Sequence, residues 1–262
     1  MCAFERSEKG MEFFMKEIKI LYLYPDILEL YGDFGNIQVL KYRIEKRGYK
    51  AIIDQYSIGD EAPDFSSYDL VFAGGGADNE QSILSEDLIK YKENIKKALD
   101  SGVFFLLICG AYQLFGKYYK GVEGNIIPCL EIFDYYTEAI NDRKKRCIGN
   151  IVLEVTLDDK KTKVIGFENH GGQTYDISTP FGNVLFGNGN KFQDTHEGFF
   201  RKNVIATYLH GPLLSKNPEL CDYIIKHCLE RKYNEDIIWQ DLDDSFETLC
   251  REQLLNTFLN KQ

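Results

Sequence analysis

Residues 104–116 read Phe-Phe-Leu-Leu-Ile-Cys-Gly-Ala-Tyr-Gln-Leu-Phe-Gly, and this stretch predicts a strand that turns sharply into a helix. Apolar residues run from Phe104 to Ile108 and end at Cys109, and small residues follow before a helical pattern begins. A thiol in that place lies at a helix N-terminus, where backbone N–H groups and the helix dipole favour the thiolate. Because most free cysteines are small core residues, the stretch alone leaves a catalytic and a packing role for Cys109 equally open.

The first hundred residues alternate between predicted strands and helices. Strands are expected at 18–24, 50–56, 68–73 and directly before Cys109, and helices from Asn36 to Gly48 and at 85–98. This alternation predicts an α/β fold of doubly wound, flavodoxin-like type, with a mostly parallel sheet and helices on both faces. Ligands bind at the carboxyl ends of such strands. The Asp33 loop, the glycine run 74–76 and Cys109 should therefore meet at one edge.

The second half of the sequence is richer in short predicted strands, at 147–157, 164–168, 183–186 and 204–209, before a helix at 217–231. We divide the chain into an N-terminal extension (1–15), one catalytic domain (16–232) and an acidic linker with a last helix (233–262). That helix, expected at about 244–259, either packs on its own domain or docks on a partner.

Composition narrows the class of protein. The 262 residues carry a net charge of −10, which argues against non-specific binding to nucleic acid or to anionic membranes. We find no apolar run long enough to cross a bilayer and no secretory signal pattern. The 7 cysteines are odd in number and lack paired C-x-x-C spacing, so we expect a reducing, cytoplasmic location and no metal site.

A cysteine nucleophile needs a base, and the chain has only 4 histidines. His210 has the best context, because it ends an apolar strand directly before a glycine; His170 is the alternative. We expect His227 to pack within a helix and His196 to be solvated. The glycine run has no P-loop pattern. It is either a flexible turn or part of an oxyanion hole formed by the N–H groups of Gly75 and Gly110.

Five stretches together resemble one family. These are Cys109-Gly110-Ala111-Tyr112-Gln113, Leu30-Tyr31-Gly32-Asp33-Phe34-Gly35-Asn36-Ile37, Gly74-Gly75-Gly76-Ala77-Asp78-Asn79-Glu80-Gln81, Gly166-Phe167-Glu168-Asn169-His170-Gly171-Gly172 and Thr207-Tyr208-Leu209-His210-Gly211-Pro212. In this order and spacing, they resemble the class I (triad-type) glutamine amidotransferases of the cobyric-acid-synthase-like branch. Within that family the chain looks most like the glutaminase subunits of lipid II isoglutaminyl synthases.

The resemblance implies an activity. Cys109 would attack the side-chain amide of L-glutamine, His210 would relay the proton, and a glutamyl thioester would be hydrolysed to glutamate. Arg146 would hold the glutamine α-carboxylate, with Arg143 as the nearby alternative, and Gln113 would line the pocket.

The resemblance also implies a partner. A Mur-ligase-like subunit of MurT type would use the ammonia to amidate the D-glutamate of the stem peptide of lipid II. ATP and magnesium would bind to that partner, so no cofactor is expected in this chain.

The sequence departs from the family at three positions: Leu107 and Ala111 replace glycines, and Pro212 replaces the glutamate two residues after the histidine. The third triad member is then absent, is Asp33 or Glu168, or comes from another chain. Three other functions stay open: a glutaminase for another synthetase, such as one that amidates a corrinoid; a non-catalytic binding protein; and a cysteine hydrolase of esters or peptides.

Overall fold

The computed structural model describes residues 4–6, 13–76, 80–234 and 237–260, and its centre is a six-stranded sheet. The strands lie in the order β15 (Phe199–Arg201), β16 (Val204–Thr207), β6 (Phe104–Ile108), β5 (Leu70–Ala73), β3 (Glu17–Leu23) and β4 (Lys50–Tyr56). All neighbours are parallel except β15 and β16. The predicted mostly parallel sheet is therefore confirmed.

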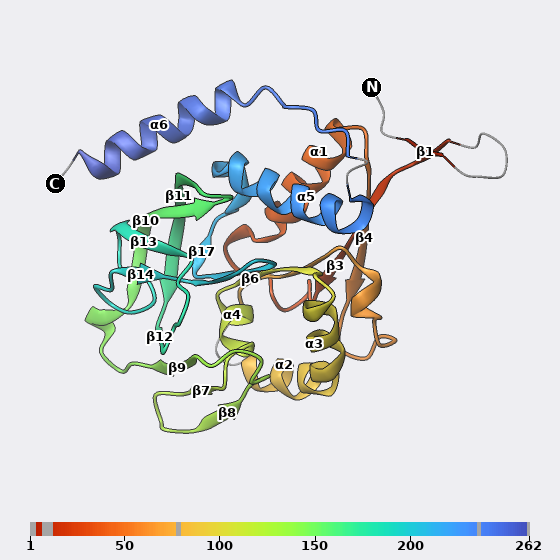
Figure 1. The fold of residues 1–262 in the computed structure, drawn as a ribbon. Helices are drawn as coiled ribbons and strands as arrows, with labels where there is room; N and C mark the ends of the chain where they lie inside the picture. Colours follow the sequence, from red (N-terminus) through yellow and green to blue (C-terminus); the bar gives the residue numbers. More distant parts are fainter. Residues whose placement is uncertain (1–3, 7–12, 77–79, 235–236, 261–262) are drawn as a thin grey trace.

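Helices cover both faces of this sheet. In Figure 1, α1 (Phe34–Lys46) and α5 (Pro218–Tyr233) lie above it, and α2 (Gln81–Leu88), α3 (Lys92–Asp100) and α4 (Gly110–Leu114) lie below it. The three strands β5, β6 and β16 are buried at every residue. Continuous apolar runs of this kind are what a parallel strand needs when helices pack on both of its sides.

The prediction of one continuous helix at 85–98 is wrong. The expected helix at 85–98 is two helices, α2 and α3, separated by a 3-10 turn at Ile89–Tyr91. The hydroxyls of Tyr24 and Tyr56 both donate to Asp87, and the hydroxyl of Tyr56 also contacts that of Tyr91, at 2.8 Å. These tertiary hydrogen bonds fix both sides of the turn, and the local pattern does not reveal them.

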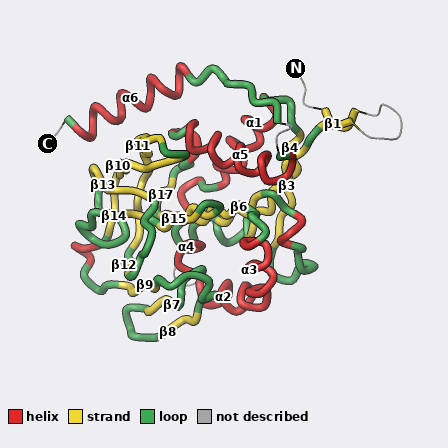
Figure 2. The backbone as a smooth tube through the Cα atoms, in the orientation of Figure 1, coloured by secondary structure: helices red, strands yellow, loops and turns green. Residues whose placement is uncertain are grey.

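Two further sheets, which the sequence did not predict as such, lie beside the central one (Figure 2). The first contains β14 (His196–Glu197), β13 (Gly182–Phe186), β10 (Cys147–Leu157), β11 (Lys160–His170) and β17 (Leu209–His210); the second contains β12 (Gly172–Tyr175), β9 (Tyr136–Ala139), β7 (Tyr118–Lys120) and β8 (Ile126–Pro128). The predicted strand 204–209 is split, because β16 pairs with β6 whereas β17 pairs with β11. His210 therefore lies where the chain passes between two sheets.

The two ends of the chain add small elements. Strands β1 (Phe4–Arg6) and β2 (Phe13–Met15) pair with each other within the expected extension. The last helix, α6 (Ser245–Leu259), lies apart from the central layers (Figure 1). It has no buried residue, although Phe258 stacks on Phe186 with the ring centroids 5.6 Å apart. The boundaries at residues 16 and 232 stay a prediction.

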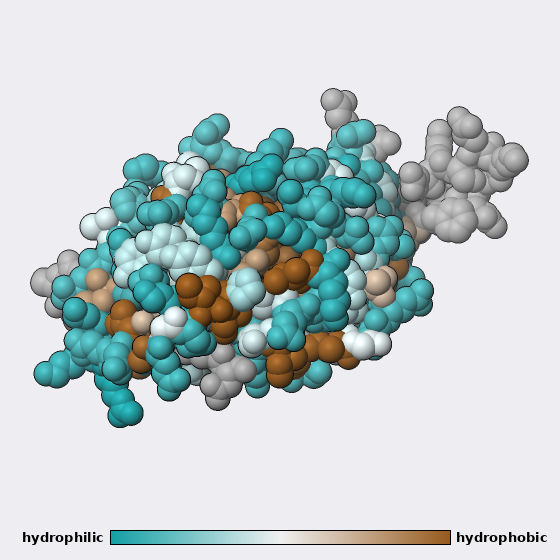
Figure 3. All heavy atoms as spheres, turned by 90° about the horizontal axis from the view of Figure 1, so that it is seen from below, coloured by the Kyte–Doolittle hydropathy of each residue, from teal (hydrophilic) through white to brown (hydrophobic). Residues whose placement is uncertain are grey.

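The surface seen from the side of α2 and of the β7–β8 hairpin is mainly hydrophilic, with scattered hydrophobic groups (Figure 3). Among the described residues, no helix combines the length and the apolar character that a bilayer-spanning segment requires.

We predict that Asp222→Ala destabilises the fold by about 3–5 kcal/mol. Asp222 accepts hydrogen bonds from Arg43 at 2.8 Å and from Arg47 at 2.7 Å, and the two arginines are only 4% and 1% exposed. Removing the carboxylate leaves Arg47 as a buried charge without this partner, while Arg43 keeps Asp244. Urea unfolding measures the loss. Asp134→Ala is the control, since that side chain is 94% exposed, and an equal loss in both variants would contradict the explanation.

Candidate active site

Cys109 lies between β6 and α4 in a strained turn. Its backbone angles are φ 50° and ψ −102°, outside the regions that most residues with a side chain adopt. The Cys109 N–H donates to the carbonyl of Thr207 at 2.8 Å, which holds the turn against the end of β16. The side chain is 7% exposed. The predicted strand, turn and helix around this cysteine are therefore present, and the strain lies at the cysteine itself.

His210 lies beside Asp33, and both side chains are fully buried. The Nδ1 atom of His210 is 3.0 Å from Asp33 Oδ2. This hydrogen bond places a proton on Nδ1 and leaves Nε2 as the nitrogen that can accept a proton from a thiol. Asp33 belongs to the loop before α1, and Asn36 in the first turn of α1 accepts the N–H of Leu214, which fixes the segment after His210.

The glycine run brings these groups together. A Cβ on Gly75 would lie 2.5 Å from Cε1 of His210, 3.3 Å from Cβ of Cys109 and 3.3 Å from Oδ2 of Asp33. The three side chains therefore surround one glycine, and only a residue without a side chain fits between them. The expected meeting of three loops at one sheet edge is observed for the Asp33 loop, Gly75 and Cys109.

The environment of His210 favours its charged form. Burial lowers the pKa of His210, but the negative charges of Cys109 and Asp33 outweigh it and raise that pKa to about 10. His170 behaves in the opposite way, because its burial lowers its pKa to about 4. The ring of His170 stacks on Tyr208 with the centroids 3.6 Å apart, and its Nδ1 lies 2.7 Å from the Gly172 carbonyl oxygen. Of the two candidate bases, His210 is the one paired with a carboxylate.

The remaining histidines lie as the sequence suggested. The ring of His227 packs against that of Tyr223 in α5, tilted by 43° and with the centroids 4.1 Å apart, and His196 is exposed in β14.

Pro212 follows His210 by two residues, at the position where the resemblance implies a glutamate. A Cβ on Gly35 would lie 2.3 Å from Cγ of Pro212, so the proline ring packs on the start of α1, two residues after Asp33. Glu168, the other carboxylate considered from the sequence, instead accepts the N–H groups of Asn188 at 2.8 Å and Gly189 at 3.1 Å. Of these two carboxylates, only that of Asp33 is hydrogen-bonded to His210.

Arg146 lies at the surface and is bonded to Asn169. Its Nε and one terminal nitrogen donate to Oδ1 of Asn169 at 3.2 and 3.0 Å, and its side chain is exposed. Arg143 begins a short 3-10 helix, Arg143–Lys145, and is also exposed. Gln113 is buried in α4, where its Nε2 donates to the Tyr208 hydroxyl at 3.1 Å and its Oε1 accepts from Gln81. The substrate-binding roles of Arg146 and Gln113 stay predictions.

The expected oxyanion donors lie close to the thiol. Gly110 is the first residue of α4, so its N–H has no acceptor within the helix. The N–H of Gly75, however, donates to Asp33 Oδ2 at 2.8 Å. A role of Gly75 as a donor to the oxyanion stays a prediction, and it requires this N–H to leave Asp33. The neighbouring Gly76 nitrogen lies 3.0 Å from the point that a Cβ on Gly110 would occupy.

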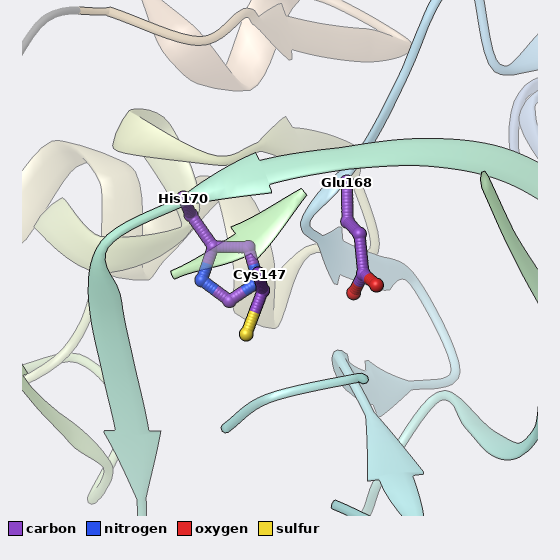
Figure 4. Close-up of side chains that lie close together, drawn as sticks. All are labelled: Cys147, Glu168 and His170. Atoms are coloured by element: carbon purple, nitrogen blue, oxygen red, sulfur yellow. The ribbon is translucent and has the colours of Figure 1, made fainter. Parts of the chain in front are cut away.

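Three buried side chains near the site have the chemistry of metal ligands. Cys147, Glu168 and His170 each offer one atom, and these atoms lie within 4.8 Å of one another (Figure 4). Cys147 is opposite His170 in the β10–β11 register, and Glu168 precedes His170 by two residues on the same face. Burial raises the pKa of Cys147 to about 12, so this thiol keeps its proton at neutral pH. The expectation that the chain holds no metal stays a prediction.

Tyr31 has no predicted role from the sequence, but it contacts His210. Its ring meets His210 edge-on with the centroids 4.9 Å apart, and Asn169 Nδ2 donates to its hydroxyl oxygen at 2.5 Å. Its place two residues before Asp33 was the only signal in the sequence.

The geometry brings a thiol, an imidazole and a carboxylate together at one edge of a doubly wound sheet. The chain belongs to the CobB/CobQ-like glutamine amidotransferase domain family, whose profile matches residues 19–218. Membership of this family makes the chain a glutamine-hydrolysing enzyme.

Two relatives are similar over most of their length. The chain is 41% identical to the lipid II isoglutaminyl synthase (glutamine-hydrolyzing) subunit GatD of Staphylococcus aureus, over 83% of this chain and 87% of that protein. It is 40% identical to GatD of Streptococcus pneumoniae, over 84% of each chain. A probable cobyric acid synthase of Methanocaldococcus jannaschii is 32% identical, but over 60% of this chain and 32% of that protein.

Solved structures agree on the fold. PurLQS from Thermotoga maritima aligns with a TM-score of 0.52 at 16% identity, covering 82% of this chain and 99% of that one. A glutamine amidotransferase crystal structure aligns with a TM-score of 0.53 at 14% identity, covering 79% and 98%. At these identities the likeness shows the fold alone.

We predict that Asp33→Asn lowers the pKa of His210 from its value of about 10, because one of the two negative charges that raise it is lost. Since the pKa is raised in the folded state, the charged imidazole stabilises the fold fully below pH 6.5 and progressively less as the pH rises to about 10. The variant should lose part of this stabilisation. An NMR titration of His210 measures the change.

Glu168→Gln is the matched control for this titration. It changes the other carboxylate considered from the sequence, whose oxygens bind the 188–189 turn instead of His210. An equal shift in both variants would contradict the assignment of Asp33 as the partner of His210.

Proposed function

We propose that the chain is the glutaminase subunit of a lipid II isoglutaminyl synthase, and that Cys109, His210 and Asp33 act together as its catalytic residues. The observation that carries the catalytic part is the cluster around Gly75, where the thiol-bearing turn, the imidazole and the carboxylate meet. The pathway rests on the 40–41% identity to GatD proteins over most of both chains.

The first half of the reaction follows from this geometry. With Asp33 holding Nδ1, the Nε2 atom of His210 takes the proton of Cys109, and the resulting ion pair is supported by the raised pKa of the imidazole, about 10. The thiolate attacks the side-chain carbonyl of glutamine. His210 then returns the proton to the departing nitrogen, which leaves as ammonia while a glutamyl thioester forms on Cys109.

Hydrolysis completes the cycle. His210 removes a proton from a water molecule, and the hydroxide attacks the thioester. The sulfur of Cys109 then leaves as a thiolate, which pairs again with the protonated His210, and glutamate departs. In both halves a negative oxygen develops near Gly110 at the N-terminus of α4. The N–H of Gly110 and one N–H of the glycine run, from Gly75 or Gly76, are the donors that would stabilise it.

Glutamine recognition is assigned to Arg146, with Gln113 lining the pocket. Arg146 uses two of its five N–H donors on Asn169, which orients the guanidinium and leaves three donors for an α-carboxylate.

The ammonia has to be used by a second protein. The printed names of the two relatives describe subunits of a glutamine-hydrolysing synthase. We assign to this chain a Mur-ligase-like partner of MurT type, which would bind ATP, magnesium and lipid II and amidate the D-glutamate of the stem peptide in the cytoplasm. A corrinoid-amidating enzyme is less well supported, because the M. jannaschii relative is matched over only 32% of its length.

Cys109→Ala should abolish ammonia release from glutamine, with activity falling by at least about 10³-fold because the nucleophile is lost. Ammonia is measured in the complex with the partner. Cys129→Ala is the control, since Cys129 is also buried but burial raises its pKa to about 12 and it lies between β8 and β9. Undiminished glutaminase activity of Cys109→Ala would refute the mechanism.

Arg146→Lys should raise KM for glutamine about tenfold or more with a smaller effect on kcat, because an ammonium cannot make the paired contacts of a guanidinium. Arg143→Lys is the matched variant three residues away. A larger KM effect in Arg143→Lys would transfer the clamp to Arg143.

Affinity purification of the tagged chain from its own cell tests the pathway. Recovery of a Mur-ligase-like protein is expected, and recovery of a corrinoid-pathway synthetase instead would overturn the assignment.

A further inference from the structure

Tyr31 combines an unusual backbone with contacts on two parts of the site. Its φ of 57° and ψ of 26° lie in the left-handed region, which is a rare place for a bulky side chain. The next residue, Gly32, also has a positive φ, of 78°. Strain of this kind persists only where the surroundings fix it, and it gathers at functional sites. The loop is fixed in part by the N–H of Leu30, which donates to the Gly75 carbonyl at 3.1 Å.

The ring of Tyr31 packs against the imidazole of His210. Its edge-on contact with His210, at 4.9 Å between centroids, is of the kind that aromatic pairs favour. His210 is fully buried, whereas Tyr31 is 45% exposed. A fully buried imidazole thus packs against a tyrosine ring that is partly exposed, and this contact restricts the orientation of the imidazole.

The hydroxyl of Tyr31 is connected to Arg146 through Asn169. Its oxygen accepts a hydrogen bond from Nδ2 of Asn169, and Oδ1 of the same amide accepts two from the Arg146 guanidinium. The amide of Asn169 can serve both neighbours only in this one orientation, with nitrogen toward the phenol and oxygen toward the guanidinium. Tyr31 thus fixes the amide that fixes the arginine.

We propose that Tyr31 is a positioning residue for glutamine hydrolysis, which holds the imidazole of His210 with its ring and the guanidinium of Arg146, through Asn169, with its hydroxyl. The proposal rests on the proposed function, because it requires Arg146 to bind the substrate carboxylate and His210 to act as the base. It deepens that function by linking recognition of the α-carboxylate to placement of the base.

Two variants test the role of the ring and the role of the hydroxyl separately. Tyr31→Phe keeps the ring and removes only the oxygen that Asn169 binds, so KM for glutamine should rise about three- to tenfold while kcat changes by less than about twofold. Tyr31→Ala removes the ring as well and keeps a side chain at the same backbone angles. In that variant kcat should also fall, by about two- to tenfold.

A carboxylate-free probe distinguishes positioning from general damage to the site. Alkylation of Cys109 by iodoacetamide, followed on its peptide by mass spectrometry, requires the thiolate but not Arg146. Tyr31→Phe should alkylate within about twofold of the unaltered chain, although its KM for glutamine is raised. Equal losses in both measurements would mean a structural role only and would overturn the proposal.

A double-variant cycle tests the link itself. Asn169→Ala should raise KM, and adding Tyr31→Phe to it should have no further effect, because both remove the same connection. Tyr42→Phe is the matched control, an exposed tyrosine on α1 that is 56% exposed. A KM for Tyr31→Phe equal to that of Tyr42→Phe, or effects that multiply in the double variant, would refute the proposal.

Cys109→Ala in the same assay distinguishes a failure of the proposed function from a failure of the role proposed for Tyr31. If Cys109→Ala keeps its activity, the proposed function fails whatever Tyr31 does. If Cys109→Ala is inactive and Tyr31→Phe is unchanged, only the role of Tyr31 fails.

Discussion

One carboxylate oxygen, Oδ2 of Asp33, is the point on which the site depends. It accepts the N–H of Gly75 at 2.8 Å and lies 3.0 Å from Nδ1 of His210. A buried carboxylate is stable only when such partners replace the water it has lost. The three residues come from the loops and strands that follow β5, precede α1 and end at β17, so one oxygen joins segments that are far apart in sequence.

Two strained residues lie beside this interaction, while the sheet that supports them is regular. The strands β5, β6 and β16 are buried throughout and pair in parallel register. The positive φ angles of Cys109 and Tyr31 occur in the turns that leave this sheet. A rigid sheet can hold such conformations, each of which costs about 1–3 kcal/mol, and the cysteine and tyrosine are thereby directed toward His210.

The sequence predicted those parts of the molecule that local patterns determine. Strands β4 and β10 have the expected bounds, and the turn at Cys109 follows from an apolar run that ends in small residues. The partner of His210 was left open among several possibilities, because Asp33 is 177 residues away and no periodicity records that contact. The same limit hid the break between α2 and α3, which depends on hydrogen bonds from Tyr24 and Tyr56 to Asp87.

The position of the carboxylate also has a consequence for how the site is organised. Two residues after the histidine, where the resemblance implies a glutamate, this chain has Pro212, which packs on Gly35 beside the loop that carries Asp33. Asp33, whose carboxylate contacts His210, therefore belongs to the same loop as Tyr31, which precedes it by two residues. Through Asn169 that loop is also connected to Arg146. A displacement of this one loop would move the support of His210 and the support of Arg146 together, whereas a carboxylate at position 212 would follow the histidine in the chain.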